Sequence, residues 1–304
     1  MRSRACPVCG SDHDHRVYAD AHFDPSQLDE FAFASRKLPE YMHYRLNECR
    51  RCDSLYASPL PTRESLEHAY VEAAFDSAEE ARYASLSYAA FLPKIVAQIG
   101  RREAALDIGT GDGAFLEQLE RQGFRRLVGV EPSAAPVAQA KPQIRPLIRQ
   151  APFRASDFEP ASFSLITCFQ TLEHVDDPQS LCRQAHGLLH ERGALFVVSH
   201  NRRALSARLL GRKSPIFDIE HLQLYSPKSL RYALERAGFC DIALYPVLNR
   251  YPLHYWLKLL PLPPALKARA LARLHGSRLG KLPVKIAAGN FAAVAYKRSA
   301  AASH

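Results

Sequence analysis

The amino-acid sequence predicts an α/β fold: a doubly wound, parallel sheet of seven strands with helices on both faces, preceded by a small cysteine-bearing module. From residue 104 onward, short apolar segments alternate with helical segments, as in parallel sheets. A glycine-rich turn at residues 109–113 follows the first of these strands. Two Cys-x-x-Cys pairs, at residues 6–9 and 49–52, lie in an N-terminal region without long apolar periods.

The predicted main domain is built from elements of ordinary length. Its seven strands are expected at residues 104–108, 127–130, 144–148, 163–169, 194–199, 242–247 and 291–296. The helices between them are expected at residues 114–122, 133–140, 178–189 and 227–237. Before this domain, apolar residues three and four positions apart predict helices at 63–74 and 78–99.

These elements divide the chain into three parts. Residues 1–60 are expected to form the N-terminal module, residues 61–99 a helical linker or cap, and residues 100–304 the main domain. A helical insert is expected at about residues 248–289, where the last two strands are separated by more than a normal connection. This insert is rich in Leu, Pro, Lys and Arg, which favours a cap or lid and leaves peripheral contact with a membrane surface as an alternative.

Composition narrows the class of protein. The chain has 304 residues, of which 47% are hydrophobic and 23% charged, as in folded globular proteins. We find neither a secretory signal nor an apolar run of about 18 residues, so an integral membrane protein is excluded and a cytoplasmic one expected. The net charge of +9 is spread over the chain without a long block of one sign, which disfavours a nucleic-acid partner. No feature of the sequence indicates an oligomeric state.

Charge at the glycine-rich turn selects the cofactor. Asp107 precedes the turn and Asp112 lies inside it, while Glu131 ends the next strand. The glycine pattern also fits a dinucleotide site, but a pyrophosphate at the helix N-terminus would be repelled by these carboxylates. S-adenosylmethionine carries a sulfonium and an ammonium group and no phosphate, so the acidic residues favour it over a nicotinamide dinucleotide.

At these positions the sequence resembles the class I S-adenosylmethionine-dependent methyltransferases, over about residues 85–247 plus the final strand. The matching segments are Asp107-x-Gly109-x-Gly111-x-Gly113, Gly129–Ser133, Phe163–Thr167 and Gln170–Val175. The resemblance implies a Rossmann-like sheet and an enzyme that uses S-adenosylmethionine as methyl donor. One departure is that residues 150–153 read Gln-Ala-Pro-Phe where the family has an acidic adenine contact, so the adenine contacts stay open.

The resemblance also implies roles for individual residues. Asp107 and the turn from Gly109 through Thr110 and Gly111 to Gly113 would hold the methionine part of the donor. Glu131, followed by Pro132, would accept hydrogen bonds from both ribose hydroxyls. Gln170, Leu172 and His174 would line the donor side of the pocket.

Histidines are the candidates for a general base if the acceptor is a hydroxyl. His174, His200 and His221 all follow predicted strands or lie in nearby loops, at the edge where parallel sheets bind ligands. His221 is the first candidate, because its loop resembles the acceptor-side loop of related methyltransferases. His174 is the second, with the alternative that it only lines the donor pocket.

The paired cysteines predict a metal site. Four thiolates from Cys6, Cys9, Cys49 and Cys52 would complete a tetrahedral zinc shell and leave no open position, so the zinc would be structural. This zinc ribbon resembles the module of certain bacterial methyltransferases, some of which modify sugars. The resemblance therefore points to a small-molecule acceptor such as a sugar or nucleotide-sugar.

Three hypotheses of function follow. The first is O-methylation of a sugar or natural-product hydroxyl. The second is a nucleic-acid-binding or nucleic-acid-modifying protein that uses the zinc ribbon as reader; the absence of an Asn/Asp-Pro-Pro-aromatic motif at residues 168–171 argues against methylation of a base amino group. The third is a non-catalytic protein that binds the donor.

Overall fold

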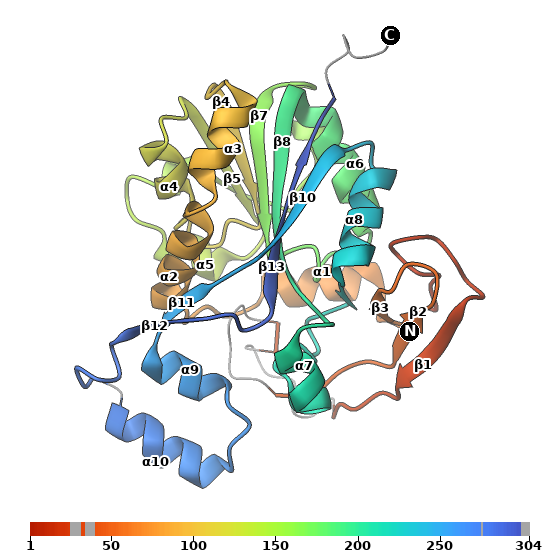
Figure 1. Ribbon diagram of the computed structural model, residues 1–304, viewed down its shortest axis with the longest axis vertical. Coiled ribbons are helices and arrows are strands. Elements are labelled where there is room, and N and C mark those ends of the chain that lie inside the picture. The colour runs from red at the N-terminus through yellow and green to blue at the C-terminus, as the bar shows by residue number, and fades with distance from the viewer. Residues whose placement is uncertain (25–31, 34–39, 275, 299–304) are drawn as a thin grey trace.

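The fold is centred on one twisted sheet of seven strands (Figure 1). The computed structural model describes residues 1–24, 32–33, 40–274 and 276–298. The strand order is β10-β13-β8-β7-β4-β5-β6. Six of these strands run in the same direction, and β13 runs opposite to them. The bounds are β4 (Ala104–Ile108), β5 (Arg126–Glu131), β6 (Ile148–Gln150), β7 (Phe163–Phe169), β8 (Leu189–His200), β10 (Cys240–Pro246) and β13 (Asn290–Tyr296). The predicted doubly wound sheet of seven strands is confirmed, except that β13 is antiparallel where a parallel strand was expected.

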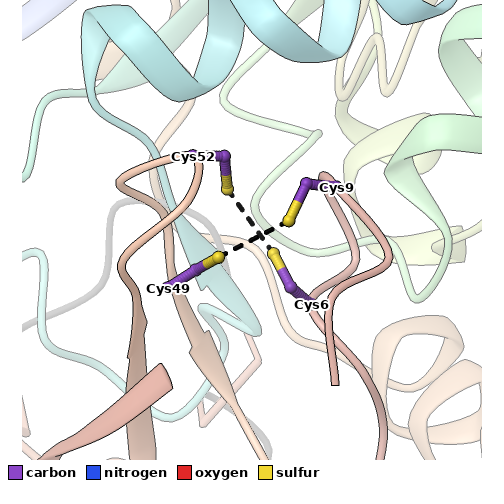
Figure 2. A group of neighbouring side chains, drawn as sticks. All are labelled: Cys6, Cys9, Cys49 and Cys52. Atoms are coloured by element: carbon purple, nitrogen blue, oxygen red, sulfur yellow. Dashed lines mark hydrogen bonds between the residues drawn. The ribbon is translucent and has the colours of Figure 1, made fainter. Parts of the chain in front are cut away.

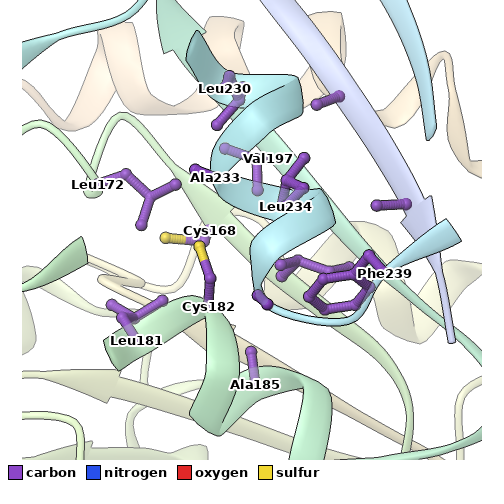
Figure 3. Close-up of a cluster of buried hydrophobic side chains, with 14 of the residues drawn as sticks. Cys168, Leu172, Leu181, Cys182, Ala185, Val197, Leu230, Ala233, Leu234 and Phe239 are labelled. Atoms are coloured by element: carbon purple, nitrogen blue, oxygen red, sulfur yellow. The ribbon is translucent and has the colours of Figure 1, made fainter. Parts of the chain in front are cut away.

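Helices cover both faces of this sheet, which is why the central strands β4 and β7 are mainly apolar. One face packs on α2 (Ala78–Ala89), α3 (Leu92–Ile99) and α4 (Leu116–Arg121). The other packs on α6 (Pro178–Leu188) and α8 (Pro227–Arg236), where Cys168 of β7 and Cys182 of α6 lie among leucines (Figure 3). Alternate residues of a strand point to opposite faces of the sheet. Ala105 packs on the side of α2, α3 and α4, and Leu106 packs on the side of α6 and α8.

Several predicted bounds differ, among them the strand expected at residues 194–199, which begins at Leu189 as β8. Proline explains two of the other differences. The expected helix over residues 78–99 is divided into α2 and α3. Pro93 lies in the first turn of α3, where a backbone N–H has no acceptor within the helix, so its absence breaks no hydrogen bond. The third strand begins at Ile148, because Arg145–Leu147, which contains Pro146, forms a 3₁₀ turn. Other 3₁₀ turns lie at Ala155–Asp157 and Gly211–Lys213, and α5 (Ala134–Gln139) lies beside β5 and β6.

The N-terminal module shares a sheet with the main domain. Its strands β1 (His15–Ala19), β2 (Leu46–Cys49) and β3 (Leu55–Ala57) pair antiparallel, and β3 then pairs with β9 (Gln223–Leu224). Helix α1 (Arg63–Val71) follows, with Thr62 as its N-cap. The module is therefore joined by backbone hydrogen bonds to the loop that precedes α8.

The insert between β10 and β13 is only partly helical. Helices α9 (Leu253–Leu259) and α10 (Pro264–Leu274) are flanked by a two-stranded ribbon, β11 (Asn249–Pro252) paired with β12 (Pro283–Ile286). Helix α7 (Leu205–Leu210) lies at the same end of the molecule (Figure 1). Among the described residues, no helix combines the length and the apolar character that a membrane span requires.

Candidate active site

The glycine-rich turn after β4 has a backbone that requires glycine. Gly109, Gly111 and Gly113 have positive φ angles of 72°, 59° and 74°. A Cβ on Gly109 would lie 2.2 Å from Oγ1 of Thr171, and one on Gly113 would lie 2.4 Å from Cγ2 of Ile144. Nothing lies within 4 Å of the corresponding position on Gly111. The turn is thus packed at its ends and open at its centre, where a ligand can approach the backbone.

Asp107 lies at the end of β4, beneath this turn. Its two carboxylate oxygens accept hydrogen bonds from the hydroxyls of Thr110, at 2.7 Å, and Thr167, at 2.6 Å. Burial raises the pKa of Asp107 to about 6, opposed by these hydrogen bonds and reinforced by the nearby carboxylate of Glu131. An ammonium group in the cavity would favour the ionised form.

Glu131 ends β5 on the opposite side of the turn. Its Oε2 accepts a hydrogen bond from Gly111 N at 2.9 Å, and its Oε1 accepts one from Ser133 N at 3.0 Å. Burial raises its pKa despite these bonds. The carboxylate is therefore fixed beside the glycine turn, where further hydroxyl donors can reach its remaining lone pairs.

Both carboxylates face a cavity of about 1000 Å³ at the carboxyl ends of the parallel strands. The glycine turn, Glu131 and Pro132 form its inner part. Pro152 and Phe153 line it where the sequence lacked an acidic adenine contact, so that part of the wall is apolar. Its outer part is lined by Tyr251, Tyr255, Trp256 and leucines of the insert. A cavity of this size can hold a donor and a second small molecule.

The segment after β7 supplies further lining. Gln170 lines the cavity in a strained conformation, with φ of 49°, and its N–H donates to Val198 O at 2.7 Å. The side chain of Leu172 does not line the cavity as the sequence predicted: it is 1% exposed and packs in the core beside α8 (Figure 3). Gly113 does not line the cavity either; it packs against Ile144 and supports the turn.

The three histidines singled out in the sequence come together. The ring of His221 lies 5.0 Å from that of His174 and 5.0 Å from that of His200, measured between centroids. All three line the cavity. Nδ1 of His221 lies 2.9 Å from Ile216 O, and Nδ1 of His174 lies 3.1 Å from Glu220 O. In both rings the Nδ1–H therefore donates to a carbonyl, and Nε2 is the acceptor nitrogen.

Three supporting residues were missed at the sequence level. Glu173 is completely buried; its Oε1 accepts from His200 N at 2.8 Å, and burial raises its pKa to about 7. Glu220 places Oε1 at 3.7 Å from Nε2 of His221. Tyr70 of α1 donates its hydroxyl to Glu220 O at 2.6 Å. Glu173 and Glu220 each directly precede a candidate histidine, and this adjacency could have identified them in the sequence. No local sequence pattern indicates a role for Tyr70.

The four paired cysteines form one buried cluster in the N-terminal module (Figure 2). Cys6 Sγ lies 3.6 Å from Cys52 Sγ, Cys9 Sγ lies 3.5 Å from Cys49 Sγ, and all four sulfurs lie within 4.8 Å of one another. Tetrahedral zinc, with Zn–S bonds of about 2.3 Å, separates its sulfurs by about 3.8 Å, so the four thiols fit this ion. The hydrogen bond between Cys6 and Cys52 lowers the pKa of Cys6 and raises that of Cys52, because the two thiols share one proton.

Comparison with known families decides the identity of the fold. Residues 80–244, more than half of the chain, match the family described as methyltransferase domain. The chain belongs to this family. Within it, the S-adenosylmethionine-dependent class I type predicted from the sequence is confirmed.

Curated relatives of this methyltransferase match only part of their length. The ubiquinone biosynthesis O-methyltransferase of Pseudomonas aeruginosa (strain UCBPP-PA14) is 32% identical over 103 residues, covering 32% of this chain and 44% of that protein. The protein of the same name from Idiomarina loihiensis is 30% identical over 153 residues, covering 46% of this chain and 62% of the relative. The chain thus spans about half the length of the curated relatives it matches.

Two solved structures with a similar arrangement are described as methyltransferases. A possible histamine N-methyltransferase from Thermotoga maritima is 18% identical, with a TM-score of 0.46, covering 72% of this chain and 92% of that one. A putative methyltransferase from Bacillus halodurans is 16% identical, with a TM-score of 0.48, covering 69% of this chain and 99% of that one. Family membership rests on the sequence match.

The pKa of Asp107 predicts how donor affinity depends on pH. Because burial raises that pKa from 3.8 to about 6, Asp107 contributes stability to the ligand-free fold below about pH 4, and loses it as the pH rises through 6. Donor binding has the opposite sign, since the ammonium prefers the carboxylate. We expect affinity for S-adenosylmethionine to fall by up to about tenfold per pH unit below 6. Calorimetric titration across this range checks it, and Asp107→Asn should bind weakly without the pH dependence.

Proposed function

We propose that this protein transfers a methyl group from S-adenosylmethionine to a hydroxyl of a small-molecule acceptor. The observation that carries the proposal is that one cavity holds both the acidic cradle of Asp107 and Glu131 and a row of three histidines. The cradle fits a cationic donor with ribose hydroxyls, and the histidines supply a proton acceptor.

On the donor side, Asp107 would attract the ammonium group and Glu131 would accept hydrogen bonds from the ribose. The backbone of the turn from Gly109 to Gly111, which is open at Gly111, would accommodate the methionine part. Pro132, Gln170 and His174 would line the rest. S-adenosylmethionine supplies an electrophilic methyl group on its sulfonium. The protein has to align the acceptor oxygen with that methyl and exclude water, which the enclosed cavity favours.

On the acceptor side, we assign His221 as the general base. Its Nδ1–H donates to Ile216 O, so Nε2 is the nitrogen able to take the hydroxyl proton. The Glu220 carboxylate, 3.7 Å from Nε2, would stabilise the imidazolium that results. His174 is the second candidate, because its Nδ1 is held in the same way and its ring adjoins that of His221.

The outer cavity favours a natural-product hydroxyl over a sugar or nucleotide-sugar. Tyr251, Tyr255, Trp256 and Leu253 line this part, and such walls bind apolar rings or chains. The curated relatives are named as O-methyltransferases of ubiquinone biosynthesis, a name that agrees with hydroxyl methylation. A panel of phenolic and sugar acceptors, with release of S-adenosylhomocysteine as the readout, tests this. Turnover of sugars alone would contradict the acceptor class.

Substitution of His221 tests the assigned base. With an acceptor found in that panel, we expect His221→Gln to lower turnover by about 10²- to 10⁴-fold, the usual contribution of a general base. Affinity for S-adenosylmethionine should change little, since the donor cradle is intact. His68→Gln, on the exposed side of α1, is the matched control. Full activity in His221→Gln, with loss in His174→Gln, would move the base to His174.

A further inference from the structure

The insert carries most of the net positive charge of the chain. Residues 248–289 contain eight Lys and Arg side chains and no Asp or Glu, in a chain whose net charge is +9. Because the basic residues are separated by leucines and prolines, no single-sign block marks them in the sequence. On α10, Arg269 and Arg273 are exposed four residues apart, on one side of the helix.

The same region exposes apolar side chains. Among the described residues, the large exposed hydrophobic side chains include six in the insert and two on α7. Leu266 of α10 is 54% exposed and shares its side of the helix with Arg269 and Arg273. Leu205 and Leu209 of α7 are 69% and 76% exposed, one turn apart. Exposed leucines grouped in this way mark an interaction surface.

Helix α7 and the insert are physically connected. Oγ of Ser206 in α7 donates to Ala288 O at 2.8 Å, and Asn201 N donates to Gly289 O at 2.9 Å. Both elements lie at the end of the molecule below the sheet (Figure 1). We call α7, α10 and residues 276–286 together the insert face.

We propose that the insert face docks on an anionic lipid surface. Basic side chains among exposed leucines satisfy both requirements of interfacial binding, attraction to anionic headgroups and burial of apolar area. A nucleic acid would neutralise the charge but would leave the leucines in water. The absence of any acidic residue in the insert removes the repulsion that an anionic surface would otherwise meet.

The docked orientation gives the cavity access to the lipid. Leu274 of α10 and Leu210 of α7 line the outer cavity from the insert face, and so does Leu257 of α9, a helix that packs against α10. An apolar acceptor dissolved in the membrane could therefore enter beside these leucines. This consequence rests on the proposed function; the docking itself requires neither donor nor acceptor.

The experiment is co-sedimentation of the full chain with phosphatidylcholine vesicles that contain or lack phosphatidylglycerol. We expect binding only with the anionic lipid. Arg269→Glu/Arg273→Glu should weaken it by at least about tenfold, and Leu266→Ser/Leu279→Ser severalfold. The matched controls are Arg183→Glu/Lys228→Glu, on α6 and α8, and Leu86→Ser on α2; they should bind like wild type.

Unchanged melting temperature and donor affinity would show that the variants fold. Absence of vesicle binding by the wild-type chain would overturn the proposal. A second result would also overturn it: vesicle binding that is abolished by an oligonucleotide and is unchanged in the leucine variant. The insert face would then be a nucleic-acid site. Vesicle binding without methyl transfer would contradict only the proposed function, and methyl transfer without vesicle binding would contradict only the docking.

Discussion

Replacing Gly111 with arginine should lower the affinity for S-adenosylmethionine by at least about a hundredfold, or about 2.7 kcal/mol. Gly111 lines the cavity at the centre of the turn, and nothing lies within 4 Å of the position of its missing Cβ. A side chain there extends into the space for the donor. The arginine guanidinium would also compete with the donor ammonium for Asp107 and Glu131.

Two controls separate loss of the site from loss of the fold. Gly111→Ala places a residue with a Cβ at the same unfavourable φ of 59° but without a long side chain. Its melting temperature should therefore equal that of the arginine variant, while its affinity for the donor should be higher. Calorimetric titration with S-adenosylmethionine, S-adenosylhomocysteine and NAD is the measurement. Unchanged affinity of the arginine variant for the first two ligands would place the donor elsewhere, and tight binding of NAD by wild type would contradict the electrostatic reasoning about Asp107.

The sheet and the donor turn were predictable because their signals are local. The central strands of the main sheet are buried on both faces and are therefore short apolar runs, as Ala104–Ile108 is, whereas the edge strand Ile148–Gln150 is exposed at two of its three residues. The turn must be glycine wherever φ is positive and a Cβ would collide, which makes Gly109 and Gly113 visible in the sequence. The predicted bounds differ around Pro93 and Pro146, where single residues change the geometry, and at β8, which begins at Leu189 rather than at residue 194.

Long-range contacts were not predictable in the same way. Leu172 lies within a family motif, but its direction is set by the packing of α8 against the sheet, so it points into the core. Tyr70 reaches Glu220 from a helix 150 positions away. The pairing of β3 with β9 joins segments that the sequence assigned to separate parts of the chain. Such contacts depend on how the elements assemble, which local patterns do not encode.

The N-terminal module, which contains the cysteine cluster, contacts the loops of all three histidines as well as pairing β3 with β9. Arg4 donates to Asp176 O at 3.1 Å, beyond His174, and to Leu222 O at 2.6 Å, beside His221. Arg202, two residues after His200, donates to Asp53 Oδ1 at 2.8 Å and also pairs with Glu48. These contacts come from the two segments that carry the cysteines, so the folded module holds the acceptor side of the cavity.

We therefore expect Cys49→Ser to abolish zinc binding and to impair methyl transfer more than donor binding. Structural zinc sites contribute about 10–16 kcal/mol of apparent binding energy in small peptides, so the variant should unfold at a much lower temperature. The donor residues lie on β4 and β5, away from the module, and should keep most of their affinity at temperatures where the sheet is intact. Metal analysis, thermal melts and donor titration are the measurements.

The matched control is Cys240→Ser, on β10 and outside the cluster. It should retain metal, melting temperature and turnover. Unchanged zinc content in Cys49→Ser would rule out the four-cysteine site. Loss of zinc with unchanged turnover would keep the site but contradict its link to the histidine loops, because Arg4, Glu48 and Asp53 would then hold their partners without the metal. Loss of turnover with donor affinity preserved would show that a structural metal outside the cavity governs the geometry of the acceptor side.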